Sequence, residues 1–264
     1  MIKNGLNTLW ENNKSALNAW LSIGNSLTAE IIAEQGYDSV TVDLQHGIID
    51  YAAAVTMLQA IRASGVTPIV RVPWLDPAAI MQALDAGAYG IICPMVNTRQ
   101  QAEQLVSYMR YPPHGSRSFG PTRALFSAGS NYAAEVNNEV TCLAMIETAE
   151  AMSNLDEIAS TPGLDGLYIG PSDLTISVTN GRLPPGFDRK EDEMLETIAK
   201  IRKAAKSAGI RACLHCGSSE YAANAVAEGF DLVTLLNDVR LLAGAASTSV
   251  TQARALIEDH VNAS

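Results

Sequence analysis

Six residues able to carry chemistry follow short apolar segments of this sequence, each just beyond the point where a segment ends. They are three acids, Asp43, Glu147 and Asp173, with Arg71, His46 and His215. If the apolar segments are parallel strands closed into one barrel, their carboxyl ends share a rim and these side chains converge there. Loop polarity would explain any single one of them. Three acids, an arginine and a histidine on one rim predict a functional site.

The two acids on neighbouring segments suggest a carboxylate pair. Glu147 directly follows the apolar segment 143–146, and Asp173 lies just past the next segment. Adjacent strands are about 5 Å apart, so the two carboxylates can converge. Such a pair serves either as a general acid and base or as ligands of Mg²⁺ or Mn²⁺, which keep positions open for substrate and water. A helix cap or a salt bridge is the alternative without a function.

Arg71 and His46 are the other predicted reactive groups. Arg71 ends the segment 68–70, where a guanidinium would meet a carboxylate or a developing oxyanion. His46 follows Asp43 by three residues, in the loop after the second segment. The carboxylate of Asp43, or that of Asp85, could orient the imidazole and raise its basicity. The sequence therefore predicts a general base at His46.

The positions of the lysines argue against a mechanism that proceeds through a lysine imine. A Schiff-base mechanism needs a lysine on a strand that faces the barrel interior. None of the six lysines lies in an apolar segment or at its end: Lys3, Lys14, Lys190, Lys200, Lys203 and Lys206. Any carbanion would therefore need a metal and fixed charges for its stabilisation.

The elements that would hold these residues are short strands alternating with helices. The apolar segments are Ala19–Ile23, Ser39–Val42, Pro68–Val70, Gly90–Cys93, Thr141–Ile146, Gly166–Ile169, Arg211–Leu214 and Leu232–Leu236. They are too short and too continuously apolar for amphipathic helices, which is typical of strands buried on both faces. Helix starts lie between them, with caps predicted at Asp76, Thr98, Thr148 and Ser218 or Ser219.

Eight strand–helix units in 264 residues predict one α/β domain, a (β/α)8 TIM barrel over residues 1–264, with an extra helical tail after Asp238. An open doubly wound sheet is the second choice, but no GxGxxG turn follows the first strand. Two connections, Tyr111–Tyr132 and Pro171–Asp192, are long enough to predict functional loops.

Composition narrows the class of protein. The net charge of −10 disfavours nucleic acid and anionic membrane surfaces as partners. Residues 1–20 have no apolar run of a signal peptide, and no stretch approaches the ~20 apolar residues of a membrane span. Cys213 and Cys216 have CxxC spacing without the second pair that a zinc site needs. We expect a reduced cytoplasmic protein.

Six motifs in order along the chain carry a family resemblance. They are Val-Asp-Leu-Gln-His-Gly (42–47), Arg-Val-Pro-Trp (71–74), Pro-Met-Val (94–96), Arg-Tyr-Pro-Pro-His-Gly-Ser-Arg (110–117), Ile-Glu-Thr-Ala-Glu-Ala (146–151) and Ile-Gly-Pro-Ser-Asp-Leu (169–174). Over residues 17–240 the chain resembles the HpcH/HpaI family of class II, metal-dependent pyruvate aldolases, including members that accept hydroxypyruvate. The resemblance implies a carbon–carbon lyase that adds the enolate of a 2-oxo acid to an aldehyde.

The resemblance also implies a metal and a substrate site. Glu147 and Asp173 would ligate Mg²⁺ or Mn²⁺, with Co²⁺ as a further option. The backbone of Gly170, Pro171 and Ser172 would hold the substrate carboxylate.

The same resemblance implies roles for the remaining rim residues. Arg71 would bind the 2-oxo oxygen and stabilise the enolate, and His46 would be the base, acting through a metal-bound water. Asp43 or Asp85 would tune that base. The family further implies a homo-oligomer, a hexamer built as a trimer of dimers, with C-terminal helices exchanged between subunits.

Two positions depart from the commoner family pattern. Gln45 stands where many relatives have Glu, and Met145 stands where some have Gln, so water positioning and substrate preference could differ. The loop residues Arg117 and Arg123 would meet an acidic or hydroxylated aldehyde, or else are solvated charges.

Three other functions stay open from the residues. A CoA-ester lyase of the same superfamily would be longer and would need a basic surface for the nucleotide. A phosphosugar isomerase could bind phosphate in the loop 215–219, but it leaves the carboxylate pair unexplained. A non-catalytic binding barrel would not need the histidine, the arginine and both acids.

Overall fold

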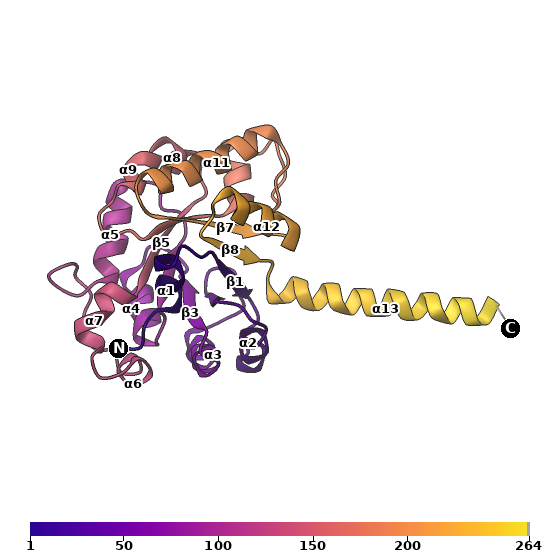
Figure 1. The fold of residues 1–264 in the computed structure, drawn as a ribbon, viewed down its shortest axis with the longest axis horizontal. Coiled ribbons are helices and arrows are strands. Elements are labelled where there is room, and N and C mark those ends of the chain that lie inside the picture. Colours follow the sequence, from indigo (N-terminus) through magenta and orange to yellow (C-terminus); the bar gives the residue numbers. More distant parts are fainter. Residues whose placement is uncertain (263–264) are drawn as a thin grey trace.

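Eight parallel strands form a closed barrel in chain order, with β8 paired back to β1. The structure is a computed structural model that describes residues 1–262 (Figure 1). The strands are β1 Ala16–Leu21, β2 Ser39–Asp43, β3 Thr67–Arg71, β4 Gly90–Cys93, β5 Thr141–Ile146, β6 Gly166–Ile169, β7 Arg211–Cys216 and β8 Leu232–Leu235. The predicted (β/α)8 barrel is confirmed, with the first strand beginning three residues earlier than its apolar segment.

The strands are buried on both faces, as their uninterrupted apolar sequences predict. Every residue of β2 to β6 is buried. Parallel pairing in register places Asp43 directly beside Arg71 at the ends of β2 and β3. The two charged side chains are thus delivered to the barrel mouth as neighbours.

Most of the helices cover the outside of the barrel, whereas the last helix extends away from it (Figure 1). The helices are α1 Gly5–Glu11, α2 Ser26–Ala33, α3 Tyr51–Ala63, α4 Pro77–Asp85, α5 Arg99–Met109, α6 Ala124–Ala128, α7 Tyr132–Glu139, α8 Ala149–Ser153, α9 Leu155–Ala159, α10 Pro171–Val178, α11 Asp192–Ser207, α12 Ser219–Glu228 and α13 Asp238–Asn262. Four predicted caps are confirmed, because the side chains of Asp76, Thr98, Thr148 and Ser218 accept hydrogen bonds from the first turns of their helices.

Both long connections contain helices that the sequence did not predict. Residues 124–128 form α6, and residues 171–178 form α10 directly after β6. Pro171 begins α10 because its fixed φ suits the first helical position and its missing N–H needs no partner there.

The core has two layers. One lies between the strands and the surrounding helices. The second fills the barrel interior and includes Trp20, Met145 and Tyr168, together with Leu6 and Trp10 of α1. The interior is therefore packed with side chains below the mouth, and a cavity can open only at the rim.

The last helix leaves the barrel. α13 extends away from the other elements, and all its residues except Asp238 are exposed (Figure 1). Its exposed apolar side chains include Leu242, Val250, Leu256, Ile257 and Val261. Among residues 1–262, no helix combines the length and apolar character that crossing a membrane requires.

Candidate active site

A cavity of about 700 Å³ opens at the carboxyl end of the barrel. Nine of the residues singled out from the sequence line it: Asp43, His46, Arg71, Met145, Gly170, Pro171, Ser172, Asp173 and His215. Glu147 is not among the lining residues, because it is buried with its carboxylate against Gly170. The structure thus gathers onto one cavity groups that come from five strands and the loops that follow them.

Arg71 is held by a carboxylate and an aromatic ring. Its Nε donates to Asp43 Oδ1 at 2.8 Å and its Nη2 donates to Asp43 Oδ2 at 2.6 Å. Both residues are buried, and the Arg71 guanidinium lies over the Trp20 ring, 4.7 Å from its centroid. Although burial acts to raise it, the pKa of Asp43 is lowered by the hydrogen bonds and charge of Arg71. A bidentate buried pair of this kind keeps the guanidinium in one orientation.

His46 faces the cavity from the loop after β2. Its backbone N–H donates to Asp43 Oδ1 at 3.3 Å, and its side chain is exposed. Asp43 therefore orients the loop by backbone contacts, and its oxygens are otherwise used by Arg71 and Trp20. Asp85 ends α4, binds Arg117 Nη2 at 2.5 Å and does not line the cavity. Within the described chain neither carboxylate contacts the His46 ring, so the predicted tuning of His46 finds no support there.

Glu147 is a buried carboxylate with one oxygen available. Its Oε1 accepts a hydrogen bond from the backbone N–H of Met95 at 2.7 Å. The φ angle of Met95 is +57°. Burial, and secondarily the charge of Asp173, raises the pKa of Glu147 to about 7 against the opposing Met95 hydrogen bond. Its Oε2 lies only 2.8 Å from where a Cβ on Gly170 would stand. Glycine at position 170 therefore makes the space that Glu147 occupies.

Glu147 and Asp173 suit a hard divalent cation. Asp173 lies in the first turn of α10, is exposed and lines the cavity. The buried Glu147 has no cationic hydrogen-bond partner within the described chain, and a cation would remove the cost of its charge. Among residues 1–262 no group of three or more His, Cys, Asp or Glu side chains could hold a metal. Two carboxylates match Mg²⁺ or Mn²⁺, which retain several waters, better than zinc.

The start of α10 offers an anion site next to this pair. Gly170 is the N-cap and has no side chain to cap the helix. The N–H groups of Ser172 and Asp173 therefore lack a side-chain cap, and the helix dipole favours negative charge there. A carboxylate beside Gly170–Ser172 would satisfy both effects.

His215 is the end of a directed hydrogen-bond chain through the barrel. Leu236 O can only accept, so His215 Nε2 carries the proton at 3.1 Å and Nδ1 accepts from Tyr168 Oη at 3.2 Å. Because the single hydroxyl proton of Tyr168 goes to His215, Tyr168 Oη accepts from Thr234 Oγ1 at 2.7 Å, and Thr234 Oγ1 accepts from Asn18 Nδ2 at 2.9 Å. Burial, followed by the charge of Arg71, lowers the pKa of His215 to about 3. The ring is a neutral part of the wall.

This geometry also bears on two loop alternatives. His215 is buried, and Ser218 Oγ caps α12 by accepting from Tyr221 N at 3.2 Å, so the loop 215–219 has little to offer a phosphate. Cys213 and Cys216 are buried and unpaired. Arg117 is buried against Tyr132 and Asp85, and neither Arg117 nor Arg123 lines the cavity, which argues against the proposed aldehyde contact.

Among the cavity residues that sequence reasoning missed, three carry large side chains that form one wall. Trp20 lies inside β1, Phe187 lies in the loop after α10, and Arg240 lies in the first turn of α13. Trp20 carries no sequence signal beyond its strand. Arg240 lies just after the last apolar segment, Leu232–Leu236, and Phe187 falls within the long connection Pro171–Asp192, so both positions could have been considered from the sequence.

Comparison with known proteins gives a consistent set of matches. The model of the HpcH/HpaI aldolase/citrate lyase family matches residues 17–242. The hydroxypyruvate/pyruvate aldolase of Rhizorhabdus wittichii is 45% identical over 253 residues, which cover 96% of this chain and 100% of that one. The 4-hydroxy-2-oxo-heptane-1,7-dioate aldolase of Salmonella heidelberg is 34% identical, covering 92% and 94%.

A solved structure agrees at the level of the whole chain. An HpcH/HpaI aldolase/citrate lyase family protein from Burkholderia cenocepacia J2315 superimposes with a TM-score of 0.87 at 29% identity. The superposition covers 96% of this chain and 100% of that one.

Proposed function

The chain is an aldolase of the HpcH/HpaI aldolase/citrate lyase family, and from this premise we propose that it reversibly adds the enolate of pyruvate, or of a related 2-oxo acid such as hydroxypyruvate, to an aldehyde. The observation that carries the proposal is the convergence of the fixed Arg71, Asp173 and the free N-terminus of α10 on one cavity, with the buried Glu147 carboxylate lying against Gly170 of the cavity wall. These groups offer a cation, a site for a divalent metal and a carboxylate site, which are the three things that a 2-oxo acid enolate needs.

In this proposal Arg71 stabilises negative charge on the keto oxygen. The Nε and Nη2 atoms of Arg71 donate to Asp43, so the Nη1 edge of the guanidinium stays available to the substrate. Because the guanidinium is already oriented, it does not reorganise when charge develops, and such a contact is worth roughly 3–4 kcal/mol in the transition state.

Glu147, through Oε2, and Asp173 would hold Mg²⁺, Mn²⁺ or Co²⁺. When bound, the ion supplies Lewis-acid polarisation of the 2-oxo acid. The backbone N–H groups of Gly170 and Ser172 would bind the substrate carboxylate, whereas Pro171, which has no N–H, starts the helix that presents them.

His46 is the proton carrier of the proposal. In the aldol direction a proton leaves C3 of the 2-oxo acid for an imidazole nitrogen, and the C3 carbanion attacks the aldehyde carbon. The proton then passes to the new alkoxide oxygen. His46 is exposed to the cavity, which suits a group that exchanges protons with substrate.

The test measures binding and chemistry separately. We expect Mg²⁺ or Mn²⁺, added back to the chelated wild-type protein, to raise its melting temperature. At a hundredfold excess over Kd the gain in free energy of unfolding should be about 3 kcal/mol. The Glu147→Gln variant should lose this gain. Deuterium exchange at C3 of pyruvate, followed by NMR, should need the metal and should fall about 10²–10³-fold in Arg71→Ala. Full exchange after rigorous chelation would disprove the metal dependence, and normal exchange in Arg71→Ala would remove Arg71 from the mechanism.

The protruding α13 supports a further part of the proposal, that the protein assembles as a homo-oligomer. A helix with Leu256 (60% exposed) and Ile257 (61% exposed) on its surface gains from a partner subunit that covers them. We expect a hexamer, a trimer of dimers with exchanged C-terminal helices. Light scattering should give six subunits, and removal of residues 244–264 should dissociate them. The unpaired cysteines support a cytoplasmic location.

A further inference from the structure

One wall of the cavity is a continuous stack with a guanidinium at each end. The Arg71 guanidinium lies 4.7 Å from the Trp20 ring centroid, and the Trp20 and His215 centroids are 4.9 Å apart. Phe187 stacks on His215 at 4.6 Å with an interplanar angle of 14°, and Arg240 lies 5.2 Å from the Phe187 centroid. All five side chains line the same cavity. Three stacked rings therefore separate the guanidinium of Arg240 from that of Arg71.

The stack is anchored from below. The hydrogen-bond chain through Tyr168 and Thr234 fixes the plane of His215, because each group in it has one donor and one acceptor role. The edge of Trp20 is fixed as well, since its Nε1 donates to Asp43 Oδ2 at 3.2 Å. The inner half of the wall has no freedom to turn away from the cavity.

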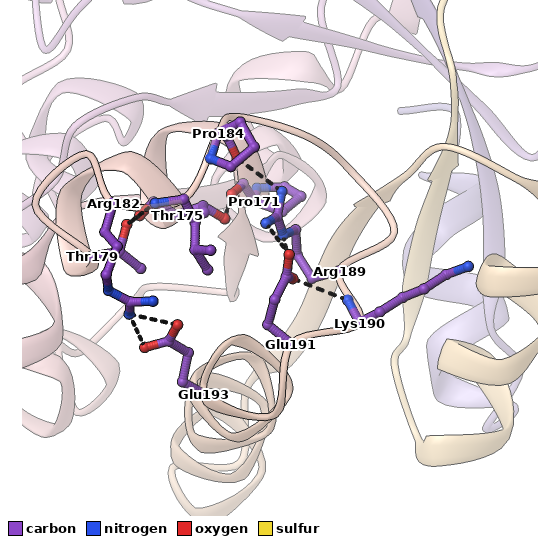
Figure 2. Close-up of polar contacts among 10 residues, drawn as sticks. Pro171, Thr175, Thr179, Arg182, Pro184, Arg189, Lys190, Glu191 and Glu193 are labelled. Carbon is purple, nitrogen blue, oxygen red and sulfur yellow. Dashed lines mark hydrogen bonds and ion pairs between the residues drawn. The ribbon is translucent and has the colours of Figure 1, made fainter.

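The loop that carries Phe187 is anchored on the other side (Figure 2). Arg189 donates to Pro184 O at 3.0 Å and makes two hydrogen bonds to the Glu191 carboxylate. Asp188 Oδ1 accepts the N–H of Gly217 at 2.6 Å, which ties the loop to the end of β7. Phe187 is thus presented to Arg240 from a loop that is bound at both ends.

The two guanidinium groups differ in charge compensation. Arg71 is paired with Asp43 at 2.6 Å. Arg240 forms no ion pair within residues 1–262, and its backbone N–H is used in capping by Asn237 Oδ1 at 2.9 Å. Asp188, which follows Phe187 in the chain, accepts a hydrogen bond from the N–H of Gly217. Arg240 therefore brings an uncompensated positive charge to the cavity of an acidic protein.

The cavity also exceeds what a three-carbon donor needs. Its 700 Å³ lies in the range that holds drug-sized ligands. The lining also includes the apolar side chains of Ile23, Ile48 and Val239, and Arg240 lies at the opposite end of the stacked wall from Arg71. This part of the cavity suits a short carbon chain with an anionic end.

We propose that Arg240 is a specificity-determining residue that selects aldehydes bearing an anionic group, a carboxylate or a phosphate, distant from the reacting carbonyl. This inference rests on the proposed aldolase function. The aromatic stack holds the guanidinium over the acceptor part of the cavity, and Arg240 has no part in enolate formation.

The test compares aldehydes of equal carbon number that differ in charge. With pyruvate as donor and Mg²⁺ present, kcat/KM is measured for 4-oxobutanoate and butanal, and for glyceraldehyde 3-phosphate and glyceraldehyde. The variants are Arg240→Gln and Arg240→Lys, with Arg254→Gln on the same helix as the matched control. Deuterium exchange at pyruvate C3, without aldehyde, reports the donor half-reaction.

We expect Arg240→Gln to lower kcat/KM about tenfold or more for at least one anionic aldehyde, mainly through KM, and to leave its neutral counterpart and C3 exchange within twofold. Arg240→Lys should recover part of the loss, because lysine keeps the positive charge but lacks the planar guanidinium that can make two parallel hydrogen bonds. The aldehyde whose kcat/KM falls in Arg240→Gln shows whether Arg240 recognises a carboxylate or a phosphate.

Equal losses for charged and neutral aldehydes would assign Arg240 a structural role and overturn the inference. Unchanged anionic kcat/KM would overturn it too, with the aldolase function intact. A wild-type protein that exchanges C3 protons but joins neither type of aldehyde would overturn the proposed function itself, and the inference with it.

Discussion

The neutral state of His215 makes the stability of this barrel depend on pH in a calculable way. An unperturbed histidine has a pKa near 6.5, whereas burial and then the charge of Arg71 lower the pKa of His215 to about 3 in the folded protein. Between about pH 3 and pH 6.5, residue 215 is protonated in the unfolded chain and neutral in the folded protein. Stability is therefore fully present above pH 6.5 and is lost as the pH falls towards 3.

The size of the effect follows from the two pKa values. Each pH unit between them changes the free energy of unfolding by about 1.4 kcal/mol. From pH 6.5 to pH 5 this amounts to about 2 kcal/mol from His215 alone. The direct contacts add little to this pH dependence, because Tyr168 and Leu236 O do not titrate in that range.

The perturbation is His215→Gln, whose amide can still donate to Leu236 O but cannot be protonated. Urea denaturation at pH 7.5 and pH 5 gives the free energy of unfolding of wild type, His215→Gln and the exposed-site control His114→Gln. We expect the wild type and the control to lose about 2 kcal/mol more than His215→Gln between the two pH values. Equal losses in all three proteins would refute the assignment of a neutral His215.

Three further perturbations follow from the site. Asp43→Asn leaves Arg71 buried without its counter-charge, so chemical denaturation should show a loss of about 3 kcal/mol or more; an unchanged midpoint would contradict a buried pair. Gly170→Ala places a Cβ 2.6 Å from Met145 Cε and 2.8 Å from Glu147 Oε2, so Mg²⁺ affinity measured by calorimetry should fall about tenfold or more. Gly120→Ala, where a Cβ meets nothing within 4 Å, should keep wild-type affinity. Trp20→Phe removes the N–H donated to Asp43, and we expect C3 exchange to fall by about tenfold while Mg²⁺ affinity is unchanged.

Local pattern was enough for the framework. Continuous apolar segments of three to six residues between capped helices predicted the barrel, because strands buried on both faces have no polar positions to alternate with. Caps such as Asp76 and Thr98 depend on one side chain and the backbone next to it, so they are readable without the fold. The rim residues Asp43 and Arg71 were predictable together, since parallel strands end at one face.

Contacts between residues distant in the chain were decided only by the tertiary structure. The sequence placed Asp43 or Asp85 beside the His46 ring, whereas the fold binds these carboxylates to Arg71 and Arg117. An ion pair is chosen by which opposite charge lies nearest after folding, and spacing along the chain does not determine that.

The cavity wall is the clearest example of this limit. Trp20, Phe187 and Arg240 come from a strand interior, a loop and a helix start, and none of them stands in a motif. The sequence by itself determined which strand-end groups, such as Asp43 and Arg71, reach the barrel mouth, because strand ends are set by local pattern. The closed barrel decided how they stack, since ring contacts of 4.6 to 5.2 Å exist only when β1, β7, the loop after α10 and the start of α13 are packed together.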